Sequence, residues 1–469
     1  MALPIARRAT RVSLPLAGAF VVGAIAYGGL YTFPAISLAF AGEFGISRTL
    51  AVTPWTMFLL VTALASPLLG RAYDEFADRD LLTASMVLLA AGWLAVYLAG
   101  DISLIILAYA AFHAIGLQLA FIGVSTAIAR RYAGVSGLTL GIAYAGPGIG
   151  VAVALPIAAQ LIQTVGWRPA SLVFMASCLI GVAFVWMMTS GPPIVVPAPG
   201  AKRPRPSATV PARSLAAIGE PLSAGQLSRR AAESKLAARA AGLHETAAPG
   251  AVSAAREIPP SGSGDHRHSV RRTVRTRRFW ILFAGAAAIG VFDEGVLQAF
   301  VPGAVHGGMR ADTAAAALGL QALAYVAGQV VGGWFSDRVG RRVVGLLAAA
   351  IVGGGVVAAI GLVAGSPSLA IAGLVLHGIG TGATIAVRSA AFGDVFGGPT
   401  FGTIFGLLAV AYPIGGTIAV YVGAIAFDST GSYALLVPVV LAALAIWSVS
   451  LWIAGPRRLR PTSGPAPSP

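Results

Sequence analysis

The stretch Gly333-Trp-Phe-Ser-Asp-Arg-Val-Gly-Arg-Arg342 lies between two long apolar segments. Its first glycine lacks a side chain, which would let two helices approach closely, and Gly340 would allow a tight turn. Asp337 can pair with a neighbouring arginine or with a helix N-terminus. The stretch therefore predicts a short, charged turn that joins two closely packed helices.

Apolar segments of similar length recur along the whole chain. Of its 469 residues, 57% are hydrophobic and 10% are charged, whereas soluble domains carry about a quarter charged residues. About 20 apolar residues in a helix cross a hydrocarbon core, and in lipid only helices and closed barrels satisfy the backbone. We predict an all-α membrane protein with twelve transmembrane helices. The expected spans lie near 13–38, 50–70, 81–99, 103–129, 137–163, 169–189, 279–304, 313–335, 343–364, 369–395, 402–427 and 433–454.

Basic residues gather on one side of these spans. With a cytoplasmic N-terminus, the two tails and the short turns on that side carry thirteen Lys or Arg, against Arg48, Arg168 and Arg310 on the other side. The positive-inside rule therefore places both termini and the central loop in the cytoplasm. The net charge of +15 then reflects topology, and no nucleic-acid partner is expected. We expect an uncleaved first helix and a multi-pass protein of a bacterial cytoplasmic membrane.

The central segment 190–278 differs in composition from the rest of the chain. It is rich in Pro, Ala, Ser, Gly and Arg and lacks the apolar periodicity that builds a core, which predicts a mostly disordered cytoplasmic linker. It separates an N-terminal six-helix bundle at 1–189 from a C-terminal six-helix bundle at 279–455, and a cytoplasmic tail follows at 456–469.

The two halves repeat each other. His113-Ala-Ile-Gly corresponds to His377-Gly-Ile-Gly, and Phe33-Pro34 corresponds to the region of Pro302. The segment from Gly70 to Asp74 corresponds in the same way to the one from Gly333 to Asp337. Parallel repeats of this kind form a central site between two halves, so we expect two pseudo-symmetric bundles.

The opening stretch resembles the signature loop of the major facilitator superfamily, in which a glycine is followed by Asp-Arg and then Gly-Arg-Arg. The resemblance implies the major facilitator fold and a secondary transporter that works by alternating access. It assigns a gating motif to Gly333, Asp337, Arg338, Gly340, Arg341 and Arg342, with Gly70 and Asp74 in the first-half copy. That copy is degenerate, because Glu75 replaces the usual basic residue after the aspartate.

Other segments resemble the monocarboxylate and oxalate/formate porter branch. They are Tyr31-Thr-Phe-Pro34, Glu43-Phe-Gly-Ile-Ser-Arg48, Phe279-Trp280, Phe401-Gly-Thr-Ile-Phe-Gly406 and Asp428-Ser-Thr-Gly-Ser-Tyr433. The resemblance implies transport of a small organic anion, coupled to protons or to counter-anion exchange. Some members carry a lysine where this chain has Ala35, and an aspartate and an arginine where it has Tyr325 and Gln329. A proton-driven exporter of a neutral or amphipathic molecule therefore remains an alternative.

Two acidic residues, Asp293 and Glu294, fall near the middle of the seventh span. An ionised carboxylate there costs about 2.5–3.5 kcal/mol on insertion scales, so such residues usually carry function. Adjacent helical residues point about 100° apart, and Glu294 shares a polar stripe with Gln298. We prefer Glu294 as the proton carrier with Asp293 as its partner, or the reverse. His113 and His377 are further candidates for proton relay, and hydrogen bonding between helices is the alternative for all four.

Candidates for substrate binding are polar side chains on otherwise apolar helices. Arg388 is the one basic residue inside a predicted span, where it would bind an anionic substrate, pair with an acid or extend towards the inner lipid headgroups. The others recur at helical spacing, which suits either a polar pathway or hydrogen bonding between helices: Tyr27, Tyr31, Gln298, Gln321, Tyr325 and Gln329. Gly146 and Pro147 resemble the Gly-Pro motif of many exchangers and predict a bend in the fifth span.

No metal-ligand spacing and no nucleophile–base set occurs in the sequence, so neither an enzyme nor a cofactor is expected. The expected partners are a small-molecule substrate, protons and the lipid bilayer, and we expect a monomer. A transporter-derived sensor that signals through the central loop is the alternative from a different class.

Overall fold

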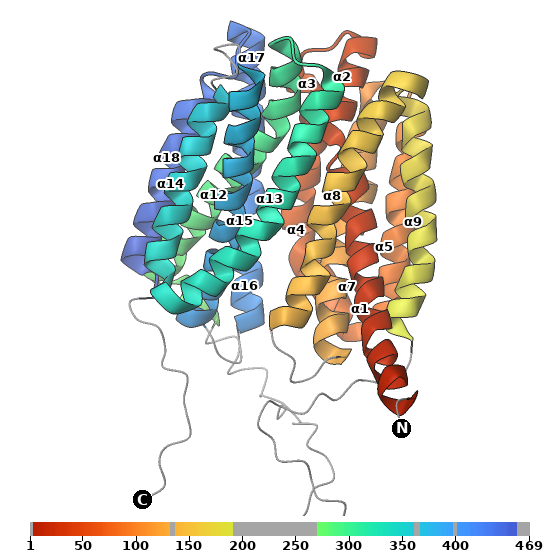
Figure 1. The fold of residues 1–469 in the computed structure, drawn as a ribbon, viewed down its shortest axis with the longest axis vertical. Helices are drawn as coiled ribbons and strands as arrows, with labels where there is room; N and C mark the ends of the chain where they lie inside the picture. Colours follow the sequence, from red (N-terminus) through yellow and green to blue (C-terminus); the bar gives the residue numbers. More distant parts are fainter. Residues whose placement is uncertain (1–2, 132–136, 191–269, 361–365, 397–400, 457–469) are drawn as a thin grey trace, which may run out of the picture. The chain divides into compact units, whose positions relative to one another are not determined.

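The computed structural model describes residues 3–131, 137–190, 270–360, 366–396 and 401–456, and within these ranges every regular element is a helix (Figure 1). The all-α prediction is therefore confirmed. Almost all of the predicted linker and tail lies outside the described residues, so those two predictions stay predictions.

The N-terminal half is built from a series of helices that includes one π-helical segment, η1. They are α1 (Leu3–Leu30), α2 (Phe33–Phe44), α3 (Arg48–Ala51), α4 (Thr53–Glu75), α5 (Asp78–Tyr97), α6 (Ile102–Leu107), η1 (Ala108–His113), α7 (Ala114–Arg131), α8 (Gly137–Val165) and α9 (Trp167–Thr189). The first span is not the single helix that the sequence predicts, because it breaks at Tyr31 and Thr32 and continues as α2. Pro34 lies in the first turn of α2, where its missing N–H has no helical acceptor to lose.

The C-terminal half follows the same order. Its helices are α12 (Arg277–His306), α13 (Ala311–Val339), α14 (Arg341–Ile360), α15 (Pro367–Phe396), α16 (Phe401–Ala409), α17 (Ala411–Thr430) and α18 (Leu436–Ala454). Among the described residues, eleven segments are long and apolar enough to cross a membrane. The predicted span 343–364 overlaps α14, which packs against α15 and α18.

Equivalent helices make equivalent contacts in the two halves. Helix α1 packs on α8 and α9, just as α12 packs on α17 and α18, and α5 packs on α7 as α14 packs on α15. Contacts between the halves run mainly through two helix pairs, α4 with α17 and α8 with α13. These pairs exchange under the internal repeat, so the contact between the halves is itself pseudo-symmetric.

Glycines allow α12 and α17 to touch backbone to backbone. A Cβ atom on Gly290 would lie 2.9 Å from the carbonyl carbon of Tyr412, and one on Gly415 would lie 2.6 Å from the carbonyl carbon of Ala287. Real Cβ atoms do not approach a backbone so closely. The contact places the side chain of Tyr412 beside the acidic residues of α12.

Gly146 and Pro147, where the sequence predicts a bend, lie in α8. This helix continues without interruption through Pro147. A Cβ atom on Gly146 would lie 2.9 Å from the carbonyl carbon of Phe20, and one on Gly23 would lie 2.9 Å from Cδ of Pro147. The motif therefore provides close packing between α8 and α1.

Candidate functional site

The two acidic residues of α12 share one hydrogen-bond partner. Asp293 is 4% exposed and Glu294 is fully buried. The hydroxyl of Tyr412, from α17, lies 2.8 Å from Oδ2 of Asp293 and 3.1 Å from Oε1 of Glu294. One phenol therefore connects both carboxyl groups.

Glu294 has further donors from both halves of the protein. Trp55 on α4 donates its indole N–H to Oε2 over 2.9 Å. Gln298, one turn along α12, and Tyr31, at the break between α1 and α2, each lie 3.5 Å from a carboxyl oxygen, at the long limit for a hydrogen bond. In contrast, Oδ1 of Asp293 has no partner among the described residues.

Arg388 of α15 lies on the other side of Tyr412, with its guanidinium carbon 5.8 Å from the centre of the phenol ring. It interacts electrostatically with Tyr325 and Asp293. Among the described residues it forms no ion pair with either acid, and its buried Nε has no hydrogen-bond partner. The predicted pairing of Arg388 with an acid is therefore not formed in this conformation.

Aromatic rings complete this neighbourhood. Tyr27 stacks on Tyr31 with ring centres 5.8 Å apart, and Tyr31 meets Trp55 edge-on at 5.1 Å. Tyr325 interacts electrostatically with both acids and with Arg388. The tyrosines and Arg388 are partly exposed while the acids behind them are buried. We call these residues the central cluster: Tyr27, Tyr31, Trp55, Asp293, Glu294, Gln298, Tyr325, Arg388 and Tyr412.

The other predicted polar residues lie outside this cluster. Gln321 is 3% exposed and packs where α13 meets Gly378 of α15, and Gln329 is partly exposed further along α13. His377 places Nε2 3.1 Å from the backbone oxygen of Phe292, next to the acids. His113 instead packs between the rings of Trp93 and Tyr109. The two histidines are equivalent in the repeat but differ in their surroundings.

Sequence reasoning missed Trp55 and Tyr412. Each is an aromatic residue with a polar hydrogen within a predicted apolar span, and that was the only signal available. Their partner Glu294 is separated from them by 239 and 118 positions in the chain.

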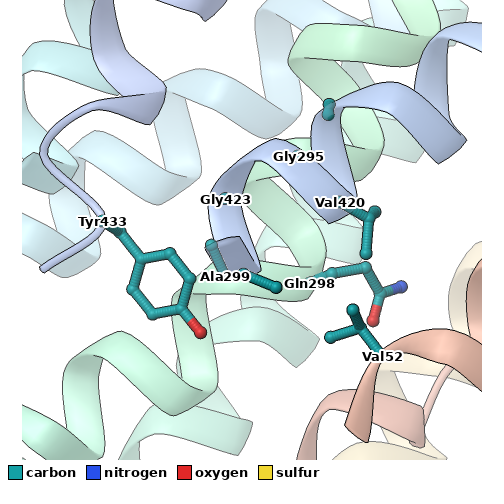
Figure 2. A pocket seen from close by; sticks show the side chains of 9 residues that line it. Val52, Gly295, Gln298, Ala299, Val420, Gly423 and Tyr433 are labelled. Carbon is teal, nitrogen blue, oxygen red and sulfur yellow. The ribbon is translucent and has the colours of Figure 1, made fainter. Parts of the chain in front are cut away.

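A small pocket adjoins the cluster at Gln298, which is one of its lining residues (Figure 2). Its lining is mostly apolar: Val52, Gly295, Gln298, Ala299, Ala419, Val420, Gly423, Ala424 and Tyr433. Gln298 therefore connects the pocket with Glu294, and its Oε1 is buried without a partner among the described residues.

Beyond the pocket, α3 and the last turn of α17 meet at what we call the outer end of the helices. Asp428 of α17 accepts hydrogen bonds from the backbone N–H groups of Arg48 and Thr49 over 2.9 and 2.8 Å, and from the hydroxyl of Thr49 over 2.6 Å. The guanidinium of Arg48 lies 5.4 Å from the centre of the Phe427 ring. These contacts join the N-terminal and C-terminal halves.

In Asp428→Ala we expect a larger fraction of molecules to be open at the outer end, because the substitution removes charge-assisted hydrogen bonds between the halves. With Ala299→Cys as a reporter in the pocket, the rate of labelling by a water-soluble thiol reagent should rise several-fold. Asp101→Ala is the matched control, since Asp101 caps α6 in the same way but within one half. Equal labelling rates with and without Asp428 would contradict this role.

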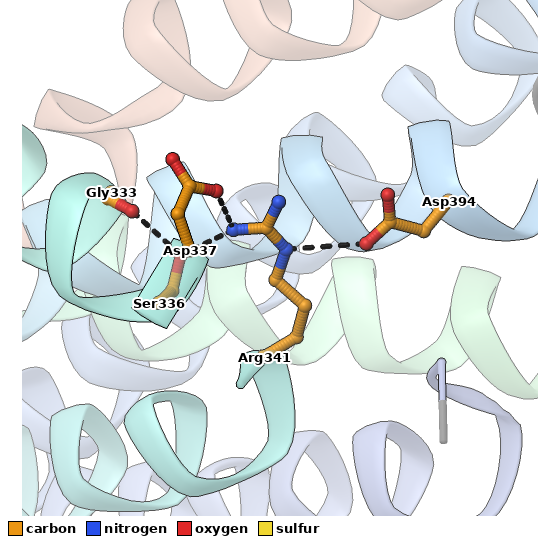
Figure 3. Close-up of polar contacts among 5 residues, drawn as sticks. All are labelled: Gly333, Ser336, Asp337, Arg341 and Asp394. Carbon is orange, nitrogen blue, oxygen red and sulfur yellow. Dashed lines mark hydrogen bonds and ion pairs between the residues drawn. The ribbon is translucent and has the colours of Figure 1, made fainter. Parts of the chain in front are cut away.

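The gating motif lies between α13 and α14, at the opposite end of the helices (Figure 1), which we call the motif end. Figure 3 shows its polar contacts. Arg341 forms an ion pair with Asp337, donates to Oγ of Ser336 over 2.7 Å, and donates Nε–H to Asp394 of α15 over 3.2 Å. Gly340 has φ +110°, so glycine suits this turn. The charged turn thus ties α13, α14 and α15 together within one half, and Asp394 is a partner that the sequence did not reveal.

Other motif residues have separate roles. Arg338 stacks on Trp334 at 3.7 Å, and Arg342 donates to the backbone oxygen of Gly455 over 3.2 Å. The expected close approach at Gly333 is wrong, because a Cβ atom there would make an ordinary 3.6 Å contact. Among the described residues, a Cβ atom on Gly70 would meet nothing within 4 Å. Gly328 and Gly332 instead face α15 closely. The side chain of Asp74 lies outside the described residues.

Two overlapping matches cover nearly the whole chain. Residues 18–303 and 283–469 each match the Major Facilitator Superfamily. The chain belongs to this superfamily. It is an integral, multi-pass membrane protein and belongs to a family of transporters rather than of enzymes. The predicted fold is therefore confirmed, as is the superfamily.

This superfamily member also resembles the riboflavin transporter RibJ of Trypanosoma brucei brucei. The two are 32% identical over 116 residues, which are 24% of this chain and 21% of the relative. The match thus spans about a fifth of that protein's length.

Proposed function

We propose that this transporter moves a small organic anion by alternating access, and that the acids of the central cluster couple the movement to protons. The observation that supports this most strongly is the position of Tyr412, which contacts both carboxyl groups through its hydroxyl and Arg388 through its ring. An anionic solute on Arg388 would therefore bind directly beside the proton-carrying groups.

The buried Nε of Arg388 has no hydrogen-bond partner among the described residues, which favours an anionic ligand. Leaving a buried donor without a partner costs about 1–3 kcal/mol, and more for a charged group, and Nε of Arg388 is such a donor. The planar guanidinium matches the two oxygens of a carboxylate. A bound carboxylate would supply the missing acceptor.

The arrangement of the helices supports alternating access. The halves meet along α4–α17 and α8–α13, and Asp428 holds them together at the outer end. With the motif end in the cytoplasm, as the charge distribution predicts, the described conformation is closed towards the outside. Rocking of the halves would break the Asp428 contacts and expose the pocket beside Gln298.

A second candidate cargo is a flat aromatic molecule. The stacked rings of Tyr27 and Tyr31, with Trp55 at their edge, suit a planar solute, and the relative RibJ is named as a riboflavin transporter. A flat aromatic cargo can be neutral, because stacking on the tyrosine rings needs no charge on the solute. Competition between lactate and riboflavin for uptake would separate the two.

Proteoliposomes with an internal pH-sensitive dye test the organic-anion proposal. We expect an inward gradient of lactate, formate or oxalate to move protons through the wild-type protein. Asp293→Asn and Glu294→Gln should each reduce the rate of this proton movement by on the order of 100-fold, as expected for a lost proton-transfer group. Asp80→Asn, an exposed carboxyl on α5, is the control that should behave as wild type. The proposal fails if none of these anions moves protons, or if both variants move them at the wild-type rate.

A further inference from the structure

The hydroxyl of Tyr412 has one proton but two carboxyl neighbours. Both distances, 2.8 Å to Asp293 and 3.1 Å to Glu294, lie within hydrogen-bonding range. A phenol donates one hydrogen bond, and an ionised carboxylate can only accept. If both acids were ionised, one of the two contacts would bring two acceptors together. A proton on one of the acids gives each contact a hydrogen of its own.

The remaining partners indicate which acid carries that proton. Glu294 faces three further donors, from Trp55, Gln298 and Tyr31, which suits an ionised carboxylate. Asp293 has Tyr412 as its single hydrogen-bond partner in the described part of the chain, and its Oδ1 is unpaired. A buried carboxylate with one partner is costly, whereas a protonated one needs only an acceptor for its O–H.

Other groups that can carry charge surround the two acids. From α15, Arg388 interacts electrostatically with Asp293, and His377 lies against the backbone of Phe292. Tyr325 from α13 and Tyr31 from the α1–α2 break complete the surroundings. Arg388 is the group on which a bound anion would act.

We propose that Tyr412 is a proton relay between Asp293 and Glu294, an inference that rests on the proposed proton coupling. Asp293 donates its O–H to the phenol oxygen while the phenol donates to Glu294. When both protons shift, the O–H bond of Asp293 breaks as a new phenol O–H forms, and the old phenol O–H breaks as Glu294 gains its proton. Tyr412 is neutral before and after, and one proton has passed from Asp293 to Glu294.

The relay explains how solute and proton are coupled. A bound anion neutralises Arg388, so Asp293 keeps its proton. When the anion leaves, the uncompensated charge of Arg388 favours ionised Asp293, and the proton passes through Tyr412 to Glu294. Glu294 contacts Gln298, which lines the pocket towards the outer end. The two acids thus serve as separate proton sites that Tyr412 connects.

Tyr412→Phe tests the relay, because it removes the hydroxyl and keeps the ring under Arg388. Proton movement and solute exchange are measured in the same proteoliposomes with lactate. The ratio of proton movement to exchange should fall on the order of 100-fold, and Tyr421→Phe, a hydroxyl on the same helix that bonds to Thr53, should leave the ratio unchanged. A purely structural role would lower both activities together, and that result overturns the proposal.

Infrared difference spectroscopy on the purified protein gives a second test that does not depend on transport. The wild type should show the carbonyl band of a protonated carboxylic acid, and Asp293→Asn should lose it while Glu294→Gln retains it. A band that persists in Asp293→Asn overturns the assignment. If wild-type protein moves protons but Tyr412→Phe leaves the ratio of proton movement to solute exchange unchanged, the relay fails and the proposed function stands. If wild-type protein moves none, the proposed function fails first.

Discussion

Gly415→Ala is expected to sharply reduce the yield of folded protein, although it adds only one methyl group. That methyl would overlap the backbone oxygen of Ala287 and lie 2.6 Å from its carbonyl carbon. A backbone cannot turn away as a side chain can, so α12 and α17 must separate. Overpacking of this kind costs about 1–3 kcal/mol, and we expect a lower melting temperature and aggregation in size-exclusion chromatography.

The same substitution at Gly406 is the matched control. Gly406 lies in α16, part of the same predicted span, and in the described part of the chain a Cβ atom there would meet nothing within 4 Å. Because alanine favours helices by up to about 1 kcal/mol over glycine, Gly406→Ala should be neutral or stabilising. Equal stability of the two variants would show that α12 and α17 are not in backbone contact.

Much of this architecture could be predicted because it follows from local patterns. Apolar segments of the right length identify helices wherever they occur, and the repeat of His113 and His377 relates the halves. The break at Tyr31 was the exception. Phe33-Pro34 was visible in the sequence, but proline is compatible with a kinked helix as well as with a new helix start.

The central cluster was only partly predictable. Asp293, Glu294 and Arg388 stand out because charge is rare inside a membrane. Tyr412 and Trp55 do not stand out, since aromatic residues are common in apolar spans, and their contacts with Glu294 depend on how α12 crosses α17 and α4. Helix phase and crossing are set by tertiary packing, which periodicity in one segment does not contain.

The same reason explains the error at the motif end. The motif points to Gly333, but the face of α13 that meets α15 carries Gly328 and Gly332. These two lie one turn apart, on one side of the helix, and Gly333 points about 100° away from Gly332. Asp394 was missed because its pairing with Arg341 joins positions 53 apart.

Arg388→Gln is expected to cause the largest loss of solute affinity. Truncating one partner of a buried, hydrogen-bonded charge pair costs about 2–5 kcal/mol, so KM for an organic anion should rise at least about 30-fold. Arg388→Lys keeps the charge but loses the planar pair of donors, and its KM should be intermediate. Uptake measured over a range of lactate concentrations checks both.

Arg310→Gln is the control, because Arg310 is a highly exposed arginine whose ion pair with Asp312 contributes little. The comparison also decides between the two candidate cargoes. An anionic cargo loses its main attraction when the guanidinium is removed, whereas a flat neutral cargo held by the rings of Tyr27 and Tyr31 does not. If Arg388→Gln leaves KM unchanged while Tyr31→Ala raises it, the organic-anion proposal is wrong and the aromatic cargo takes its place.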